Sequence, residues 1–405
     1  MRVPLLIHHF IIIAVCTAAG PGVGAQTNPP DLRTAVEAAW QRSPHARTLE
    51  ARRDEAAAGR EAAQSWLAGS PSLGLAQRTD RWNNREGVRE TEVSLSTPVW
   101  LPHQKSARMT QAQRSSDDLE AQIAHAKLTI AGEVRERLWA VALSQEVLAE
   151  ARNHRQHLDA MAEEVMRRVK AGDLSRADGI LAQQEALAGK VAVVDAHAKL
   201  QEALSRYTTL TGLTALPPTE PERLDTATPE GHPRRVAANA AIEHAQASLQ
   251  LVNKTRNEPP TVGLAMRRER DSSASAPASS ISFAVQFPIG TNARNRPLET
   301  AARTQVETAT AEATQVDTAL RIEQALARQQ LAAAEQALDT ATARATLAHE
   351  HVQLIEKAFR LGERGLADML RARTALHEAE VAERQQRVAV GLAHARLNQA
   401  LGILP

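Results

Sequence analysis

The sequence has almost no cysteine and very few aromatic residues. Of its 405 residues, one is cysteine and only 2% are Phe, Trp or Tyr. Large aromatic side chains usually dominate the core of a compact globular domain. The chain is rich instead in Ala, Leu, Glu, Gln and Arg, a composition that favours long helices packed side by side.

The sequence also lacks an excess of charge and the common catalytic motifs. Its 48 Lys and Arg balance 47 Asp and Glu, for a formal net charge of +1, so nothing in it attracts nucleic acid specifically. It contains no GxSxG, GxGxxG, phosphate-loop or HExxH motif. We therefore expect neither an enzyme nor a cofactor. Of the 14 histidines, His154 and His157 share one helix face, which we expect to be solvated rather than part of a metal site.

The N-terminus has the pattern of a secretory signal peptide, which we place at residues 1–25. Arg2 precedes an apolar run over residues 5–16, and Val23-Gly24-Ala25 supplies small residues for cleavage. Cys16 follows Ile13-Ala14-Val15, which resembles a lipidation motif, although Val15 stands where a small residue is usual. Cys16 is either lipidated or removed with the signal peptide, and the sequence leaves both alternatives open. No later run of about 18 apolar residues predicts a membrane-spanning helix.

The strongest internal signal is a duplication. Pro44 and Pro233 are 189 residues apart, and Gly172 and Gly362 are 190 apart. Matching positions at nearly one offset predict two similar structural repeats, at 26–213 and 233–405. A Pro-rich stretch, 214–232, is expected to link them.

Each repeat is expected to contain two strands. The alternation of Ile281, Phe283 and Val285 with small or polar residues is typical of a strand with one apolar face. We place the strands at about 71–79, 88–99, 260–268 and 280–290. Four strands cannot close a barrel, and an open edge cannot lie in lipid. The strands are therefore either soluble hairpins or part of a barrel that several copies share, with eight strands from two copies or twelve from three.

Each repeat is also expected to contain a long helical hairpin, at 103–212 and 297–402. No proline interrupts either hairpin after its first residues, and a helix of about 65 residues would reach about 100 Å. Gly172 and Gly362 are expected to end the first helix of each hairpin in a left-handed conformation. Ser175 and Asp178 then fit a capping box on the returning helix, and Gly365 and Asp368 take the same places in the second repeat.

These hairpin ends resemble the TolC-type outer-membrane efflux protein family. The segments that carry the resemblance are Ala358-Phe359-Arg360-Leu361-Gly362-Glu363, residues 368–373, their first-repeat counterpart at 170–178, and the opening residues 32–44. The sequence of residues 359–373 is most similar to sequences of the branch that serves cobalt-zinc-cadmium resistance. The resemblance implies a mostly α-helical fold with a small β part. It implies a homotrimer with a periplasmic α-barrel tunnel topped by a twelve-stranded transmembrane β-barrel in the outer-membrane lipid.

The resemblance also implies a function and a site. The trimer would be a passive duct for heavy-metal cations or drugs, delivered by an inner-membrane pump of the resistance-nodulation-division (RND) type through a periplasmic membrane-fusion adaptor. Asp368 would line the pore constriction with Arg364 nearby, and Arg371 stands where a second acid is usual. The hairpin tips that would dock the adaptor comprise Gly172, Asp173, Leu174, Ser175, Asp178, Gly362, Glu363, Gly365 and Leu366. A periplasmic coiled-coil adaptor without a pore is the alternative, although it would carry one hairpin rather than two.

Overall fold

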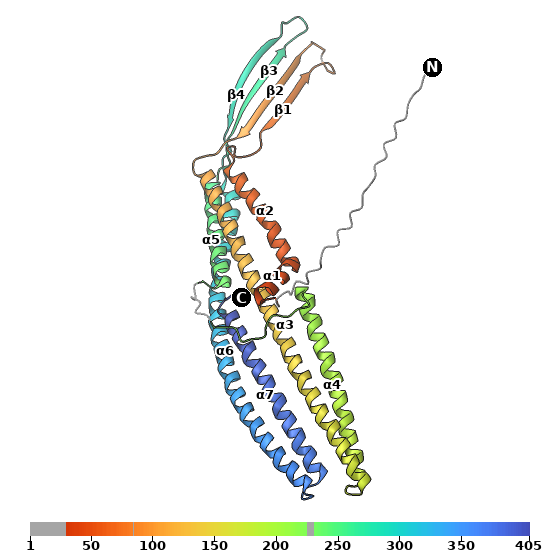
Figure 1. Cartoon of the computed structure of the whole chain (residues 1–405). Helices are drawn as coiled ribbons and strands as arrows, with labels where there is room; N and C mark the ends of the chain where they lie inside the picture. The colour runs from red at the N-terminus through yellow and green to blue at the C-terminus, as the bar shows by residue number, and fades with distance from the viewer. Residues whose placement is uncertain (1–29, 84, 225–230) are drawn as a thin grey trace, which may run out of the picture.

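The molecule is long and curved, with a sheet at one end and two helical hairpins at the other (Figure 1). This computed structural model describes residues 30–83, 85–224 and 231–405. The expected signal peptide, Cys16 and residues 225–230 of the expected linker lie outside the described residues. Among the described residues, no helix is both long and apolar enough to cross a membrane.

The order of elements is helix, two strands and a long helical hairpin, and it occurs twice. The first series comprises α1 (Leu32–Arg42), α2 (Pro44–Gln64), β1 (Ser72–Thr79), β2 (Arg89–Pro98), α3 (Gln104–Ala171) and α4 (Arg176–Thr211). The second comprises α5 (Pro233–Lys254), β3 (Thr261–Arg270), β4 (Ala278–Gln286), α6 (Asn292–Arg360) and α7 (Leu366–Ala400). The helices α3 and α6, with 68 and 69 residues, run from below the sheet to the far tips (Figure 1).

Two expected boundaries in the second repeat were wrong. The hairpin begins at Asn292 rather than at Pro297, because Thr291 caps the helix with its hydroxyl and Pro297 is accommodated within the second turn. A proline so close to a helix start removes few backbone hydrogen bonds. Strand β4 ends at Gln286 rather than near residue 290, because Gln286 already faces Thr261, the first residue of its partner strand.

The four strands form one antiparallel sheet in the order β1-β2-β3-β4. Strands β2 and β3 come from different repeats, and they pair along ten residues from Arg89 opposite Arg270 to Pro98 opposite Thr261. The sheet therefore joins the two repeats. It leaves β1 and β4 as edges with unpaired backbone groups.

The helical middle has its own apolar core beneath the sheet. Trp40 of α1, Leu49 of α2, Val134 of α3 and Tyr207 of α4 are all buried in it. Farther toward the tips, the two hairpins touch through α3 and α7, where Trp139 lies directly on Gly391. A methyl group on Gly391 would lie 2.0 Å from the Trp139 ring, so only glycine permits this close approach.

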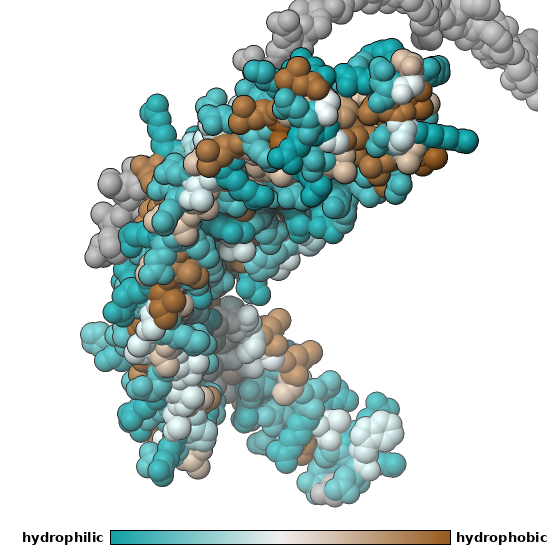
Figure 2. Space-filling model, turned by 90° about the horizontal axis from the view of Figure 1, so that it is seen from below, coloured by the Kyte–Doolittle hydropathy of each residue, from teal (hydrophilic) through white to brown (hydrophobic). Residues whose placement is uncertain are grey.

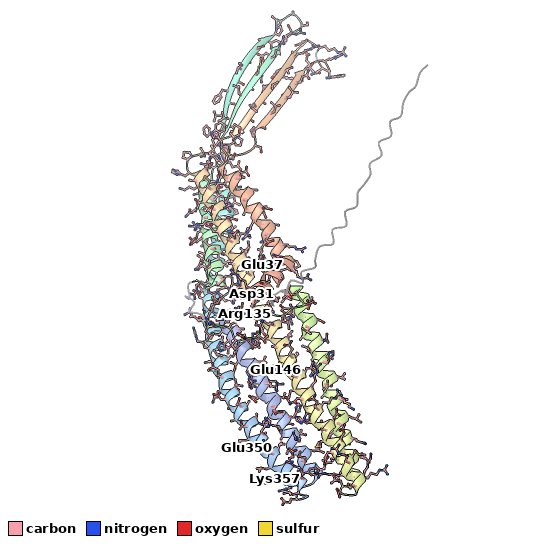
Figure 3. The ribbon with its side chains drawn as sticks, viewed as in Figure 1. Asp31, Glu37, Arg135, Glu146, Glu350 and Lys357 are labelled. Carbon is pink, nitrogen blue, oxygen red and sulfur yellow. The ribbon has the colours of Figure 1, made fainter. Side chains whose placement is uncertain are left out.

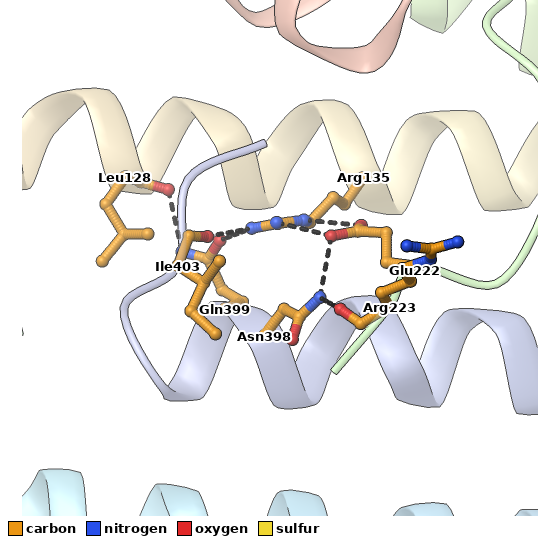
Figure 4. A network of polar contacts seen from close by, with 7 residues as sticks. All are labelled: Leu128, Arg135, Glu222, Arg223, Asn398, Gln399 and Ile403. Atoms are coloured by element: carbon orange, nitrogen blue, oxygen red, sulfur yellow. Dashed lines mark hydrogen bonds and ion pairs between the residues drawn. The ribbon is translucent and has the colours of Figure 1, made fainter. Parts of the chain in front are cut away.

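A buried arginine ties the two repeats and their linker together. Arg135 of α3 is 2% exposed and donates two hydrogen bonds, of 2.8 and 2.7 Å, to the carboxylate of Glu222 in the linker (Figure 4). It also donates to the Gln399 side chain of α7 at 2.8 Å and to the backbone carbonyl of Ile403 at 3.1 Å. Asn398 completes the network by donating to Glu222 at 3.1 Å. Figure 3 places Arg135 near the middle of the long axis.

Replacing Arg135 by Met is expected to destabilise the protein by about 3–5 kcal/mol, because the Glu222 carboxylate loses its partner in a largely buried place. The urea midpoint of the purified protein, followed by circular dichroism, measures the change. The double variant Arg135→Met/Glu222→Leu should recover part of the loss. Arg53→Gln breaks a surface pair with Glu120 and is the control, expected to cost under about 1 kcal/mol. Equal losses in both single variants would contradict a special role for the buried pair.

Candidate functional site

The sheet has one continuous apolar face that the chain leaves exposed. Directly paired residues on neighbouring strands point to the same face. Two full rows of this face comprise Leu73, Leu95, Leu264 and Phe283, then Leu75, Val93, Met266 and Ile281. All eight side chains are exposed, from 46% at Val93 to 77% at Leu73. An apolar face of this size is costly in water and points to lipid or to another apolar partner.

The opposite face of the sheet carries small and polar residues. Its rows comprise Ser72, Ser96, Gly263 and Ala284, then Gly74, Ser94, Ala265 and Ser282. A sheet with one apolar face and one small, polar face fits a wall between hydrocarbon and an aqueous lumen.

The tip of the first hairpin is a tight turn with both helix ends capped. Gly172 ends α3 at φ +86°, and the next amide, that of Asp173, donates to the Arg168 carbonyl at 2.9 Å. The Ser175 hydroxyl accepts from the Asp178 amide at 3.2 Å, and the Asp178 carboxylate accepts from the Ser175 amide at 3.1 Å. The expected capping box between Ser175 and Asp178 is thus present. Leu174 is half-buried against the neighbouring apolar cluster.

The tip of the second hairpin repeats the turn without the side-chain cap. Gly362 has φ +75°, and the Glu363 amide donates to the Ala358 carbonyl at 2.9 Å. Gly365 takes the cap position of α7, where it has no side chain to accept a hydrogen bond. Gly362, Glu363 and Gly365 are all exposed.

The Asp368 carboxylate lies between two arginines. It accepts a hydrogen bond from Arg371 at 2.7 Å, and the Arg364 guanidinium lies 3.9 Å away. Asp368 is 33% exposed at its side chain, whereas Arg364 and Arg371 are 59% and 78% exposed. The contact with Arg371 spans three residues of one helix, so within one chain it does not join two helices. The arginines largely offset the negative charge that an acidic constriction needs.

An apolar cluster fastens the two hairpin tips together. Leu158 and Val165 of α3 meet Phe359 of α6 and Met369 of α7 in it, and the Arg168 guanidinium lies over the Phe359 ring. Leu366 belongs to this cluster and is only 2% exposed. The side chain of Leu366, one of the tip residues expected to dock the adaptor, thus packs between the two hairpins.

A partly buried polar cluster joins α3 and α7 between the middle of the molecule and the tips. The His154 ring stacks on the His377 ring of α7 with centroids 3.9 Å apart, and His377 lies 3.3 Å from Glu150, a carboxylate 1% exposed. Arg384 contacts the same carboxylate at 3.3 Å. Burial, together with the nearby His377, lowers the pKa of His154 to about 4.

This cluster corrects the expectation for His154. The residue packs against α7 and does not lie on a solvated helix face, whereas His157 is exposed. Within residues 30–83, 85–224 and 231–405, no group of three or more His, Cys, Asp or Glu is arranged to hold a metal ion. Periodicity along α3 could not reveal the cluster, because His377 and Arg384 come from α7, more than 200 residues away in the sequence.

The outer helices of both hairpins carry apolar stripes that the chain does not cover. On α4 the exposed stripe comprises Ile180, Leu187, Val191 and Val194, and on α6 it includes Leu347 and Leu354, with Leu361 at the C-cap directly after the helix. Spacings of three, four and seven residues keep each stripe on one side of its helix. Seen from the hairpin end, the molecule curves around an open side and hydrophobic residues appear as separate spots on a largely hydrophilic surface (Figure 2).

Comparisons with known proteins address the fold and the sequence separately. No protein-family model matches the sequence. The cobalt-zinc-cadmium resistance protein CzcC of Cupriavidus metallidurans is 26% identical over 219 residues, which make up 51% of this chain and 52% of that protein. The chain therefore matches about half the length of this curated relative.

Solved structures of outer-membrane proteins share the whole fold. The outer membrane protein VceC of Vibrio cholerae gives a TM-score of 0.71 at 17% identity, over 92% of this chain and 96% of that chain. CusC, whose structures concern transmembrane channel formation, gives 0.75 at 14% identity, over 93% of both chains. The outer-membrane channel MtrE of Neisseria gonorrhoeae, in its open state, gives 0.70 at 16% identity, over 92% and 89%.

The chain has the fold of TolC-type outer-membrane channel proteins, a mostly helical fold with a small antiparallel sheet. This agreement confirms the fold that the resemblance implied, and the curated relative CzcC is by name a cobalt-zinc-cadmium resistance protein. Two of the solved structures with this fold, those of CusC and MtrE, are described as channels.

Replacing Gly362 by Val is expected to loosen the second tip by about 1–2 kcal/mol, because a β-branched residue is strained at positive φ. Nothing lies within 4 Å of the added Cβ, so crowding does not contribute. Hydrogen exchange read by mass spectrometry should be faster over residues 355–370. Gly365→Ala, at φ −83° and equally uncrowded, is the control. Unchanged exchange in the Val variant would exclude a conformational need for glycine.

Acidification is expected to weaken the contact between the hairpins through His154. Its pKa is lower in the folded protein, about 4, than the ordinary 6.5, so the folded state binds fewer protons. The stability from neutral His154 is complete above about pH 6.5 and is lost as the pH falls toward 4. The measurement is the difference in urea midpoint between wild type and His154→Phe at pH 7.5 and at pH 5. A difference that does not change with pH would contradict the assignment.

Proposed function

We propose that the protein is the outer-membrane channel of a tripartite efflux system of the RND type. Three copies close around a common axis, so that their sheets form one twelve-stranded barrel in the outer membrane and their hairpins form a tunnel through the periplasm. A periplasmic membrane-fusion adaptor docks at the hairpin tips, and an inner-membrane pump of the RND type supplies the cargo. The cargo consists of heavy-metal cations, a proposal supported by the similarity to CzcC.

The observation that carries the proposal is the sheet. Its apolar face is exposed along its whole width, and β1 and β4 have unpaired edges. In hydrocarbon an unpaired backbone group costs several kcal/mol, so a sheet enters lipid only when it closes on itself. Pairing of β1 in one copy with β4 in the next satisfies both edges at once. It also turns the small, polar residues of the other face toward the lumen.

The helical stripes support the same ring. Within one chain α4 packs on α3 and α1, whereas α6 packs on α7 and α5. The uncovered stripes therefore lie on the two outer helices, on opposite flanks of the hairpin pair (Figure 1). When copies close into a ring, α4 of one copy meets α6 of the next, and both stripes are buried.

The tip residues determine the net charge of the proposed constriction. Asp368 contributes one negative charge per copy, but Arg364 and Arg371 surround it. We infer that the constriction carries little net negative charge while the Asp368–Arg371 contact is intact. Exposed residues of both turns, among them Asp173 and Glu363, remain available for the adaptor.

Planar-bilayer recordings of the purified protein test the proposal directly. Wild type should give steady ion currents, because the pore is a passive duct. Arg371→Ala should increase the preference for cations by exposing the Asp368 charge, and Asp368→Asn should shift it toward anions by leaving the arginines unpaired. The reversal potential in a salt gradient measures both changes.

Membrane fractionation separates the proposal from the adaptor alternative. The channel should leave outer membranes only with detergent, whereas an adaptor without a pore washes off in salt or alkali. Release without detergent, together with no current in bilayers, would overturn the proposed function. Identical reversal potentials in wild type and both tip variants would instead remove Asp368 and Arg371 from the constriction.

A further inference from the structure

The apolar face of the sheet ends in a border of arginines. Beyond the row of Leu75 and Ile281, toward the strand loops, the next row of the same face holds Gln77, Thr91, Arg268 and Ser279. The row after it holds Thr79, Arg89 and Arg270. Within the strands, every charged side chain on this face is therefore an arginine.

The opposite face holds all the acidic residues of the strands. Arg78, Glu90 and Glu269 form one of its rows, and Glu92 and Arg267 belong to another. The Arg267 guanidinium lies 3.0 Å from Glu90 and 3.1 Å from Glu92, so the charges of this face are paired among themselves. The sheet thus sorts its charges by face, which composition alone conceals.

The three arginines of the apolar face lack ion-pair partners among the described residues. Arg89 and Arg268 are exposed, and neither guanidinium lies within 4.0 Å of a carboxylate in the described part of the chain. The Nε of half-buried Arg270 is shielded from solvent and has no hydrogen-bond partner. The loops beyond contain Asp80, whose carboxylate accepts from the Gly87 amide at 2.9 Å, and the exposed acids Glu86 and Asp271. Where such a surface lies against lipid and water is scarce, an unpaired guanidinium is stabilised by an anionic partner from outside the chain.

The position of this border identifies the partner. Arg89 begins β2 and Arg270 ends β3, next to the apolar rows, and these strand ends lie at the end of the sheet farthest from the hairpins (Figure 1). If the apolar rows lie in hydrocarbon, the arginines lie at the depth of the lipid headgroups. A planar guanidinium binds phosphate through two parallel hydrogen bonds and is weakly hydrated, which suits this boundary.

We propose that Arg89, Arg268 and Arg270 form a binding site for the phosphate groups of anionic lipid headgroups in the leaflet that faces away from the periplasm. The proposal rests on the proposed function, because it requires the sheet to lie in the outer membrane. The partner is a phosphorylated glycolipid of the lipid A type, held by its headgroup phosphates beside the apolar rows.

Lipid retention tests the site. Wild type is reconstituted in phosphatidylcholine nanodiscs that contain a minor share of lipid A, and native mass spectrometry counts the lipid A molecules that stay bound after extraction. The triple variant Arg89→Gln/Arg268→Gln/Arg270→Gln should retain about tenfold less, since one charge-assisted hydrogen bond corresponds to about that factor. Arg268→Gln alone changes one exposed side chain and should give a smaller loss in the same direction.

The opposite face supplies the control. Arg78 has a side chain 80% exposed, and its Arg78→Gln variant should retain lipid A as wild type does. Dephosphorylated lipid A should bind wild type as weakly as phosphorylated lipid A binds the triple variant. Equal binding of both lipids, or equal losses in the triple variant and Arg78→Gln, would overturn the proposal.

Ion conduction by the channel is measured separately from lipid retention. The triple variant should conduct like wild type in pure phosphatidylcholine bilayers, where no lipid A is present. If wild type conducts normally but retains no more lipid A than the triple variant, the lipid site alone is overturned. Absence of currents from wild type would overturn the proposed function.

Discussion

An unpaired sheet edge cannot lie in lipid, and this chain has two such edges. Strands β1 and β4 bound a four-stranded sheet whose apolar face is exposed, so one copy satisfies neither its backbone nor its side chains. The apolar stripes on α4 and α6 have the same character. In the proposed channel, closure of several copies into a ring pairs both sheet edges and covers the apolar surfaces. The single chain is one protomer of that ring.

The two repeats of each copy must be held in a fixed arrangement for such a ring to close. Strand pairing between β2 and β3 fixes them at one end, and the Arg135 network fixes them at the middle by joining α3, the linker and the end of α7. A buried ion pair is an uncertain source of net stability. Its directional hydrogen bonds nevertheless specify one arrangement of three segments that are far apart in the sequence.

Between this midpoint and the tips, the two hairpins touch through three successive kinds of contact. Trp139 packs closely on Gly391, then the Glu150–His154–His377–Arg384 cluster follows, and an apolar cluster around Phe359 and Leu366 closes the end. The polar cluster is the part of this contact that responds to protonation. In the proposed channel, the ease with which the second hairpin moves against the first depends on these three layers together.

The sequence by itself determined the elements: the duplication, the strand alternation, the hairpins without internal proline, and the turns at Gly172 and Gly362 all follow from local chemistry. A left-handed turn selects glycine, and a helix start selects Ser175 with Asp178, whatever surrounds them. Only the tertiary structure decided that Leu366 is buried, that His154 stacks on His377, that Arg135 binds Glu222, and that the sheet sorts its acids and arginines onto opposite faces. These features depend on pairs separated by tens to hundreds of residues, and local periodicity carries no record of which distant side chain a residue will meet.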